Sequence, residues 1–165
     1  MLRMSKLADY GTVVMTAMAR APDRIHSAAN LAVQTELALP TVTKVLKTLA
    51  RKRLLESVRG AKGGYVLART PREISLAQVI SAMEGPIGVT ECGSALGLCL
   101  QETGCAVRTN WQRINRMVLE VLDQFTLEQM AQPIGRTLSI GMPAARKPLR
   151  GSGSTAAGRI AGAES

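Results

Sequence analysis

Apolar residues recur at intervals of three and four over much of the first half of the chain, a pattern typical of helices packed on a core. Between residues 5 and 20 the apolar positions are Leu7, Tyr10, Gly11, Val14, Met15 and Met18. Ser5 is suited to cap this helix and Pro22 to end it. A second, shorter helix is predicted after Ser27, and it leads into a turn whose Pro40 lies at or near the first position of a third helix.

A third helix is predicted over residues 41–52, and its two sides differ in chemistry. The apolar side consists of Val42, Val45, Leu46, Leu49 and Ala50. The opposite side carries Thr41, Thr43, Lys44, Lys47, Thr48, Arg51 and Lys52. Because short hydroxyls suit base edges and cations suit phosphates, the helix pair favours a helix-turn-helix that reads DNA. For this pair alone, an ordinary solvated helix face is the alternative.

Two short strands, residues 54–58 and 65–68, follow this helix and flank a basic, glycine-rich loop. This arrangement predicts a wing, with Arg59 and Lys62 along the minor groove or the flanking phosphates. A nucleotide-binding loop is disfavoured, because no helix begins directly after Gly64 and no Lys-Ser or Lys-Thr pair follows it.

Two further helices are predicted beyond the wing. Ser75 is suited to cap a helix with apolar positions Leu76, Val79, Ile80 and Met83. A longer helix after Cys105 carries an apolar stripe formed by Trp111, Ile114, Met117, Val118, Val121, Leu122 and Phe125. This stripe has heptad-like spacing and is wider than one small domain can cover, so it predicts a dimer interface. Thr126 is suited to cap a short final turn.

Positive charge is concentrated in the predicted DNA-binding half. Residues 1–83 hold 13 Lys and Arg against 5 Asp and Glu, residues 84–135 hold 3 against 6, and residues 136–165 hold 5 against 1. The basic first half suggests a polyanion-binding module, and the scarcity of aromatic residues favours duplex DNA over single strands. The last segment lacks an apolar period and is expected to be disordered. No signal peptide or spanning segment is evident, so we expect a cytoplasmic protein that does not bind membranes.

All three cysteines fall within a short segment, as Cys92, Cys99 and Cys105. An odd number cannot pair off completely within one chain, and such clustering in an intracellular protein indicates metal or redox chemistry. Thiolates suit zinc, copper(I) or iron–sulfur clusters, with a fourth ligand from elsewhere. A loop with three incidental thiols is the alternative. A cysteine-dependent enzyme is disfavoured, because the single histidine, His26, lies far from the cysteines in sequence.

Several features occur together and are specific as a set. They are Ser-Lys-Leu-Ala-Asp-Tyr-Gly at 5–11, Ser-Val-Arg-Gly-Ala-Lys-Gly-Gly-Tyr at 57–65, Leu-Ala-Gln-Val-Ile-Ser-Ala-Met-Glu at 76–84, the three cysteines and Trp111. Over residues 1 to about 132 the chain resembles the Rrf2 family of iron–sulfur-sensing winged-helix regulators, typified by IscR and NsrR. The ending Phe125-Thr126-Leu127-Glu128-Gln129-Met130 looks like the branch that regulates SUF-type cluster-assembly operons.

The resemblance implies a mainly α architecture in four parts. These are a winged helix-turn-helix of three helices and a two-stranded wing (1–84), a cysteine-bearing cluster loop (85–110), a dimerisation helix region (111–132) and a basic tail (133–165). It also implies a homodimeric, DNA-binding transcription regulator that controls iron–sulfur cluster assembly genes. Such a protein is not an enzyme and takes no small-molecule substrate.

The resemblance also implies roles for individual residues. Cys92, Cys99 and Cys105 would hold a [2Fe-2S] or [4Fe-4S] cluster. Arg59 would enter the minor groove, and the outer face of the third helix would enter the major groove. The alternative is a regulator of the same fold that works through thiol redox chemistry or bound zinc, without iron.

The fourth cluster ligand departs from the isc-type pattern. The position of the isc-type histidine ligand is Arg108, which cannot bind iron, and the first cysteine spacing is one residue longer than expected. In the nitric-oxide-sensing branch the fourth ligand is an N-terminal carboxylate of the partner subunit, and Asp9 stands at the matching place. Asp9 is therefore a candidate ligand for the partner's site, with a role in the helix dipole as the alternative. Glu91 and Glu102 are further candidates.

Overall fold

The computed structural model describes residues 4–60, 62–90 and 105–132. The chain divides into two units, Met1–Ile134 and Gly135–Ser165, and every described residue belongs to the first unit. The predicted basic tail lies outside the described residues. None of the helices in the described ranges is long and apolar enough to cross a membrane.

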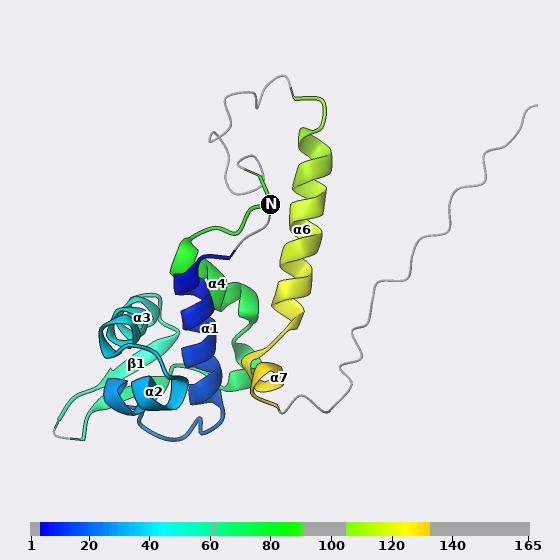
Figure 1. Ribbon diagram of the computed structural model, residues 1–165. Helices are drawn as coiled ribbons and strands as arrows, with labels where there is room; N and C mark the ends of the chain where they lie inside the picture. The colour runs from blue at the N-terminus through cyan, green and yellow to red at the C-terminus, as the bar shows by residue number, and fades with distance from the viewer. Residues whose placement is uncertain (1–3, 61, 91–104, 133–165) are drawn as a thin grey trace, which may run out of the picture. The chain divides into compact units, whose positions relative to one another are not determined.

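Helix α1 (Lys6–Ala19) is the centre of the helical packing. It contacts α2 (Ala28–Thr35), α3 (Leu39–Arg51), α4 (Leu76–Glu84) and α7 (Leu127–Ala131), as Figure 1 shows. Gly11 lies on the buried side of α1, where a Cβ atom would come within 2.8 Å of Cγ of Met83. The absence of a side chain at this position therefore lets α1 and α4 cross closely.

The largest buried side chains of the core come from α1, α2, α3, α4 and α7, together with Ile74 just before α4. They are Val14, Met15, Met18, Leu31, Val42, Val45, Leu46, Leu49, Ile74, Val79 and Leu127. Each such side chain contributes about 1.5–3 kcal/mol when it is removed from water. Nearly all of them fall on the periodic positions of the sequence, and the predicted helices are confirmed.

The helix-turn-helix is formed by α2 and α3. Ser27 caps α2, with its Oγ accepting from the N–H of Asn30 at 3.1 Å. Glu36 ends α2 in the left-handed conformation (φ 56°). Helix α3 begins at Leu39, so Pro40 is its second residue, near the first position where it was predicted. The first turn of a helix needs no N–H from this residue.

The wing consists of β1 (Leu55–Val58) and β2 (Gly64–Leu67), which pair antiparallel with Val58 opposite Gly64. The backbone of Tyr65 also exchanges two hydrogen bonds with His26, each 2.9 Å long. A Cβ atom on Gly64 would collide with the carbonyl oxygen of His26, so the glycine allows the chain at His26 to lie close to the wing. The predicted winged helix-turn-helix is confirmed.

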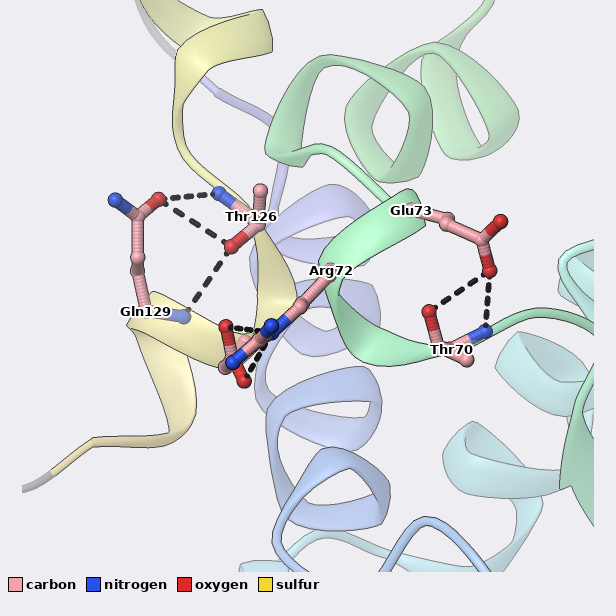
Figure 2. Close-up of polar contacts among 6 residues, drawn as sticks. Thr70, Arg72, Glu73, Thr126 and Gln129 are labelled. Carbon is pink, nitrogen blue, oxygen red and sulfur yellow. Dashed lines mark hydrogen bonds and ion pairs between the residues drawn. The ribbon is translucent and has the colours of Figure 1, made fainter.

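A short 3-10 helix, η1 (Pro71–Glu73), was not predicted. It begins at Pro71, after β2 has ended at Leu67. The carboxylate of Glu73 caps this turn by accepting from the N–H of Thr70 at 3.0 Å and from its hydroxyl at 2.8 Å, as Figure 2 shows. Proline is suited to this place, because the first turn of a helix leaves its N–H groups unpaired.

The long helix α6 (Arg108–Gln124) is attached to the winged domain at its C-terminal end. There the backbone of Leu76 donates to Phe125 at 2.7 Å, and Leu127 donates to Ile74 at 2.9 Å. Arg72 and Glu128 form an ion pair at 2.8 Å beside these bonds (Figure 2). Thr126 caps α7 as predicted, through a reciprocal pair with Gln129 (Figure 2).

Candidate nucleic-acid interface and cysteine segment

The exposed face of α3 contains a shallow hollow of about 550 Å³. Its lining consists of Leu39, Pro40, Thr43, Lys44, Lys47 and Arg51. Lys44, Lys47 and Arg51 are exposed, so their charges are available to a polyanion. The hollow therefore combines three cationic side chains with the apolar first turn of α3.

Two of the six predicted DNA-contacting residues of α3, Thr41 and Thr48, do not line this hollow. At about 100° per residue they lie together on the flank of the helix away from Leu39 and Thr43. Thr48 accepts a hydrogen bond from Arg51 at 3.4 Å, which makes it a support for that side chain. The hydroxyl of Thr43 donates to the carbonyl oxygen of Leu39 at 2.8 Å.

The tip of the wing presents two cations. Arg59 directly follows β1 and Lys62 precedes β2, and both are exposed. The turn is tight, because the N–H of Gly63 donates to Gly60 at 2.9 Å. A Cβ atom on Gly63 would lie 2.5 Å from the carbonyl oxygen of Val58, so only glycine fits there.

Of the three predicted metal ligands of the cysteine segment, the structure describes only Cys105. Its thiol is free and half-buried, three residues before the first residue of α6. Cys92, Cys99 and the carboxylates of Glu91 and Glu102 lie outside the described residues. In the described ranges no group of three or more His, Cys, Asp and Glu side chains could hold a metal ion. A soft thiolate at residue 105 fits iron or zinc by its donor chemistry.

A buried amide near the cysteine segment was missed in the sequence. Asn115 is only 4% exposed, and its Oδ1 accepts from the N–H of Val89 at 3.0 Å. Its Nδ2 donates to the carbonyl oxygen of Ile87 at 3.3 Å. The backbone that leads into the cysteine segment is thus bound to the middle of α6. Within the sequence, Asn115 has the appearance of an ordinary polar position on a helix.

Asp9 lies in the first turn of α1 and is exposed. It shares a surface hollow with Glu84, a second carboxylate that the sequence analysis did not single out. Glu84 is the last residue of α4, after which the chain leads to the cysteine segment. Its carboxylate accepts a hydrogen bond from the N–H of Ser5. Asp9 is therefore accessible to a partner, and it lies next to this segment's point of departure.

One face of α6 is apolar and open. Trp111, Ile114, Met117 and Val121 are exposed, with Met117 at 52%. An apolar hollow of about 400 Å³ lies along Ile114, Met117, Val118, Val121 and Leu122. Contiguous apolar surface of this kind marks an interaction site.

The single histidine and the residue at the isc-type histidine position are both half-buried. The Nε2 atom of His26 lies 3.0 Å from the carbonyl oxygen of Ala21. Its backbone is paired with the wing. Arg108, at the position of the isc-type histidine, is half-buried and forms the first residue of α6.

Comparisons with known proteins agree with this architecture. Residues 4–133 match the model of the Rrf2 family, described as iron-dependent transcriptional regulators. CymR of Bacillus subtilis is 32% identical over 131 residues, which cover 79% of this chain and 90% of CymR. NsrR of Halalkalibacterium halodurans is 25% identical over 131 residues, which cover 78% of this chain and 90% of NsrR.

Solved structures show the same similarity. The structure of CymR, described as the global cysteine regulator of B. subtilis, matches with a TM-score of 0.64 and covers 79% of this chain and 97% of its own. The structure of IscR of T. potens has a TM-score of 0.61 at 28% identity and covers 78% of this chain and 85% of its own. The chain therefore belongs to the Rrf2 family of DNA-binding transcription regulators, and these are not enzymes.

Proposed function

We propose that the protein is a homodimeric regulator that reads duplex DNA with α3 and the wing and senses iron–sulfur cluster status through its three cysteines. The observation that carries the sensing role is the position of the cysteines. All three lie between the winged domain and α6, and Cys105 is a free thiol just before α6. A chemical change at this segment would therefore act on both the winged domain and α6.

The DNA-reading role is supported by the charges and shape of α3. Lys44, Lys47 and Arg51 are spaced along one exposed face, as phosphate contacts require. Thr41 and Thr48 belong to the predicted reading face and lie on the flank of α3 away from Leu39. Arg59 and Lys62 extend the positive surface to the wing tip, where a minor groove or its phosphates would lie.

The dimer is supported by the open apolar face of α6. Helices with a heptad-like apolar seam pair with one another, and a second copy supplies a matching seam. Winged-helix dimers bind half-sites about one DNA turn, ~34 Å, apart, so the position of α6 sets the distance between the two reading helices.

The sensing role is supported by the donor set and by Asn115. Cys92, Cys99 and Cys105 would hold the cluster, and Asp9 of the partner subunit is the proposed fourth ligand. When bound, a cluster would fix three thiolates that are otherwise separate. Asn115 keeps the segment before Cys92 on α6, so a rearrangement of the cysteines is transmitted to the dimer helix. A coupling of ~1–3 kcal/mol is enough to change DNA occupancy.

The names of the relatives point to different signals, since one solved structure is described as a cysteine regulator and another is an IscR. The deciding experiment is purification without oxygen, followed by an absorption spectrum and assays for iron and acid-labile sulfide. We expect broad visible bands that bleach in air, with iron and sulfide in similar amounts. Cys105→Ser is expected to lose these bands and keep the helical circular dichroism spectrum.

A colourless protein that contains zinc or no metal and still binds duplex DNA would overturn the cluster and leave the DNA-reading role in place. The cysteines would then form a structural zinc site or a thiol switch. Because iron–sulfur status is the proposed signal, genes for cluster assembly are the proposed targets. Binding to promoters of such genes, with and without the cluster, tests this.

A further inference from the structure

The first turn of α3 exposes apolar side chains in the middle of a basic surface. Leu39 is 48% exposed although it is a large apolar residue, and Leu37 packs against the core whereas Leu39 does not. Pro40 follows it and lines the same hollow as Thr43 and the three cations. The core therefore does not explain why an exposed leucine begins this helix.

Thr43 adds to the apolar character of this turn. Its hydroxyl donates to the carbonyl oxygen of Leu39 at 2.8 Å, so its proton is used within the helix. The side chain then offers its methyl group and the remaining lone pairs of the oxygen. Pro40 has no N–H at all. The side chains of these three residues consequently present methyl and methylene groups and no free hydrogen-bond donor.

Base pairs present one apolar group in the major groove, the 5-methyl group of thymine. The N-terminal residues of a recognition helix are the ones that contact base edges. We propose that Leu39, Pro40 and Thr43 form a thymine-reading surface that selects half-sites with thymine methyl groups opposite the first turn of α3. Lys44, Lys47 and Arg51 hold the helix on the adjacent phosphates. This inference rests on α3 being the reading helix.

Charge complementarity identifies the occupant of this hollow as duplex DNA. The hollow is bordered by three exposed cations, and the described parts of α3 carry no acidic side chain in its first turn. An apolar protein partner would have to leave these cations without counter-charges. A polyanion whose groove carries methyl groups satisfies both the cations and the apolar turn.

The test uses the full-length protein and begins with selection of bound sequences from a random duplex library. We expect the selected half-sites to contain invariant thymines. Each of these thymines is then replaced by uracil, which removes the methyl group and keeps the base pairing. Wild-type affinity is expected to fall ~4-fold for each contacted methyl, the loss for one buried methyl-sized group.

Variants assign the effect to the proposed residues. Leu39→Ala and Thr43→Ser should abolish the difference between thymine and uracil at their positions, whereas Thr43→Val, which keeps a methyl group, should retain it. Val33 is 81% exposed on α2 and does not line the hollow, so Val33→Ala is the matched control with an unchanged ratio.

Selected sites that bind equally well with thymine and uracil would overturn the inference, as would full discrimination by Leu39→Ala. Either result would leave the DNA-reading role of α3 intact. A wild-type protein that selects no duplex sequence would instead overturn the reading role and this inference together.

Discussion

The side-chain Oδ1 of Asn115 accepts a hydrogen bond from the backbone N–H of Val89 at 3.0 Å. Val89 lies just before the cysteine segment. The same amide donates to Ile87 at 3.3 Å, so one side chain satisfies a backbone donor and a backbone acceptor that lie 26 and 28 residues earlier. The cysteine segment is thereby connected to α6 before its first cysteine.

We predict that Asn115→Leu destabilises the protein, because it leaves the N–H of Val89 and the carbonyl of Ile87 without this partner. An unsatisfied buried group costs about 1–3 kcal/mol, and we expect the lower end because Ile87 and Val89 are half-buried. Asn115→Asp keeps the acceptor for Val89 and should lose less. Urea unfolding measures both, with the exposed Asn110→Leu on the same helix as control. Equal unfolding midpoints for Asn115→Leu and Asn110→Leu would show that the hydrogen bonds of Asn115 do not stabilise the fold.

A second prediction concerns the apolar face of α6. Met117→Glu places a carboxylate in the middle of the exposed seam and should convert the dimer to a monomer, because a buried unpaired charge costs several kcal/mol. Sedimentation velocity measures the mass, and affinity for a two-half-site duplex should fall with it. Arg116 is exposed on the opposite side of α6, so Arg116→Glu is the control that should stay dimeric. A wild-type monomer, or a dimeric Met117→Glu protein, would refute the seam.

Local features of this fold could be predicted from sequence, because they depend on neighbouring residues. Ser5, Ser75 and Thr126 were identified as helix caps, and each accepts a hydrogen bond from a backbone N–H three residues later. Ser27, after which a helix was predicted, caps α2 in the same way. Such caps need only a short polar side chain beside the first turn. The apolar periods similarly identified the buried faces.

Features that depend on distant segments could not be predicted. Asn115 is buried and bonds to the distant backbone at Ile87 and Val89, and no local pattern indicates this contact. Ser75 was identified as a cap, but its hydroxyl also donates to Asp123 at 2.6 Å, which connects α4 to α6. Leu39 was assigned to the turn because Pro40 was taken as the helix start. The site residues Cys92 and Cys99 lie outside the described residues, so their arrangement stays a prediction.

A third prediction separates phosphate contacts from other charges. Lys44→Ala and Lys47→Ala should each weaken DNA binding by a similar factor for all sequences and reduce the slope of log K against log salt by about 1. Fluorescence anisotropy at several salt concentrations gives the slope. Arg113 is exposed on α6, away from α3, so Arg113→Ala should keep the wild-type slope. An unchanged slope in both lysine variants would remove these residues from the interface.

A fourth prediction concerns pH and the cap of η1. Hydrogen bonds from the hydroxyl and the N–H of Thr70 lower the pKa of Glu73 below its ordinary value. Since the folded pKa lies below the unfolded one, the cap stabilises the fold above the unfolded pKa, and this contribution is lost as pH falls through the folded pKa. Thr70→Val removes the hydroxyl and should raise the pKa of Glu73, as measured by carboxyl-carbon NMR titration. Thr70→Ser should leave it low, and an unchanged pKa in Thr70→Val would contradict the cause.

The last prediction tests whether Asp9 acts on its own subunit or on its partner. Asp9 is exposed in the first turn of α1, so its carboxylate is accessible to a second copy. A mixed dimer is made from an Asp9→Ala subunit with intact cysteines and a subunit with all three cysteines changed to serine. If Asp9 binds the partner's cluster, the one remaining cluster still has a carboxylate ligand and should give the wild-type spectrum.

The reciprocal mixed dimer, with Asp9→Ala and the serine changes in one subunit and a wild-type partner, provides the matched control. Its single cluster faces the altered Asp9, so its spectrum should differ from that of the wild type. The opposite pair of results would assign Asp9 to its own subunit. Wild-type spectra from both mixed dimers would show that Asp9 is not a ligand, and its charge would then stabilise the first turn of α1 through the helix dipole.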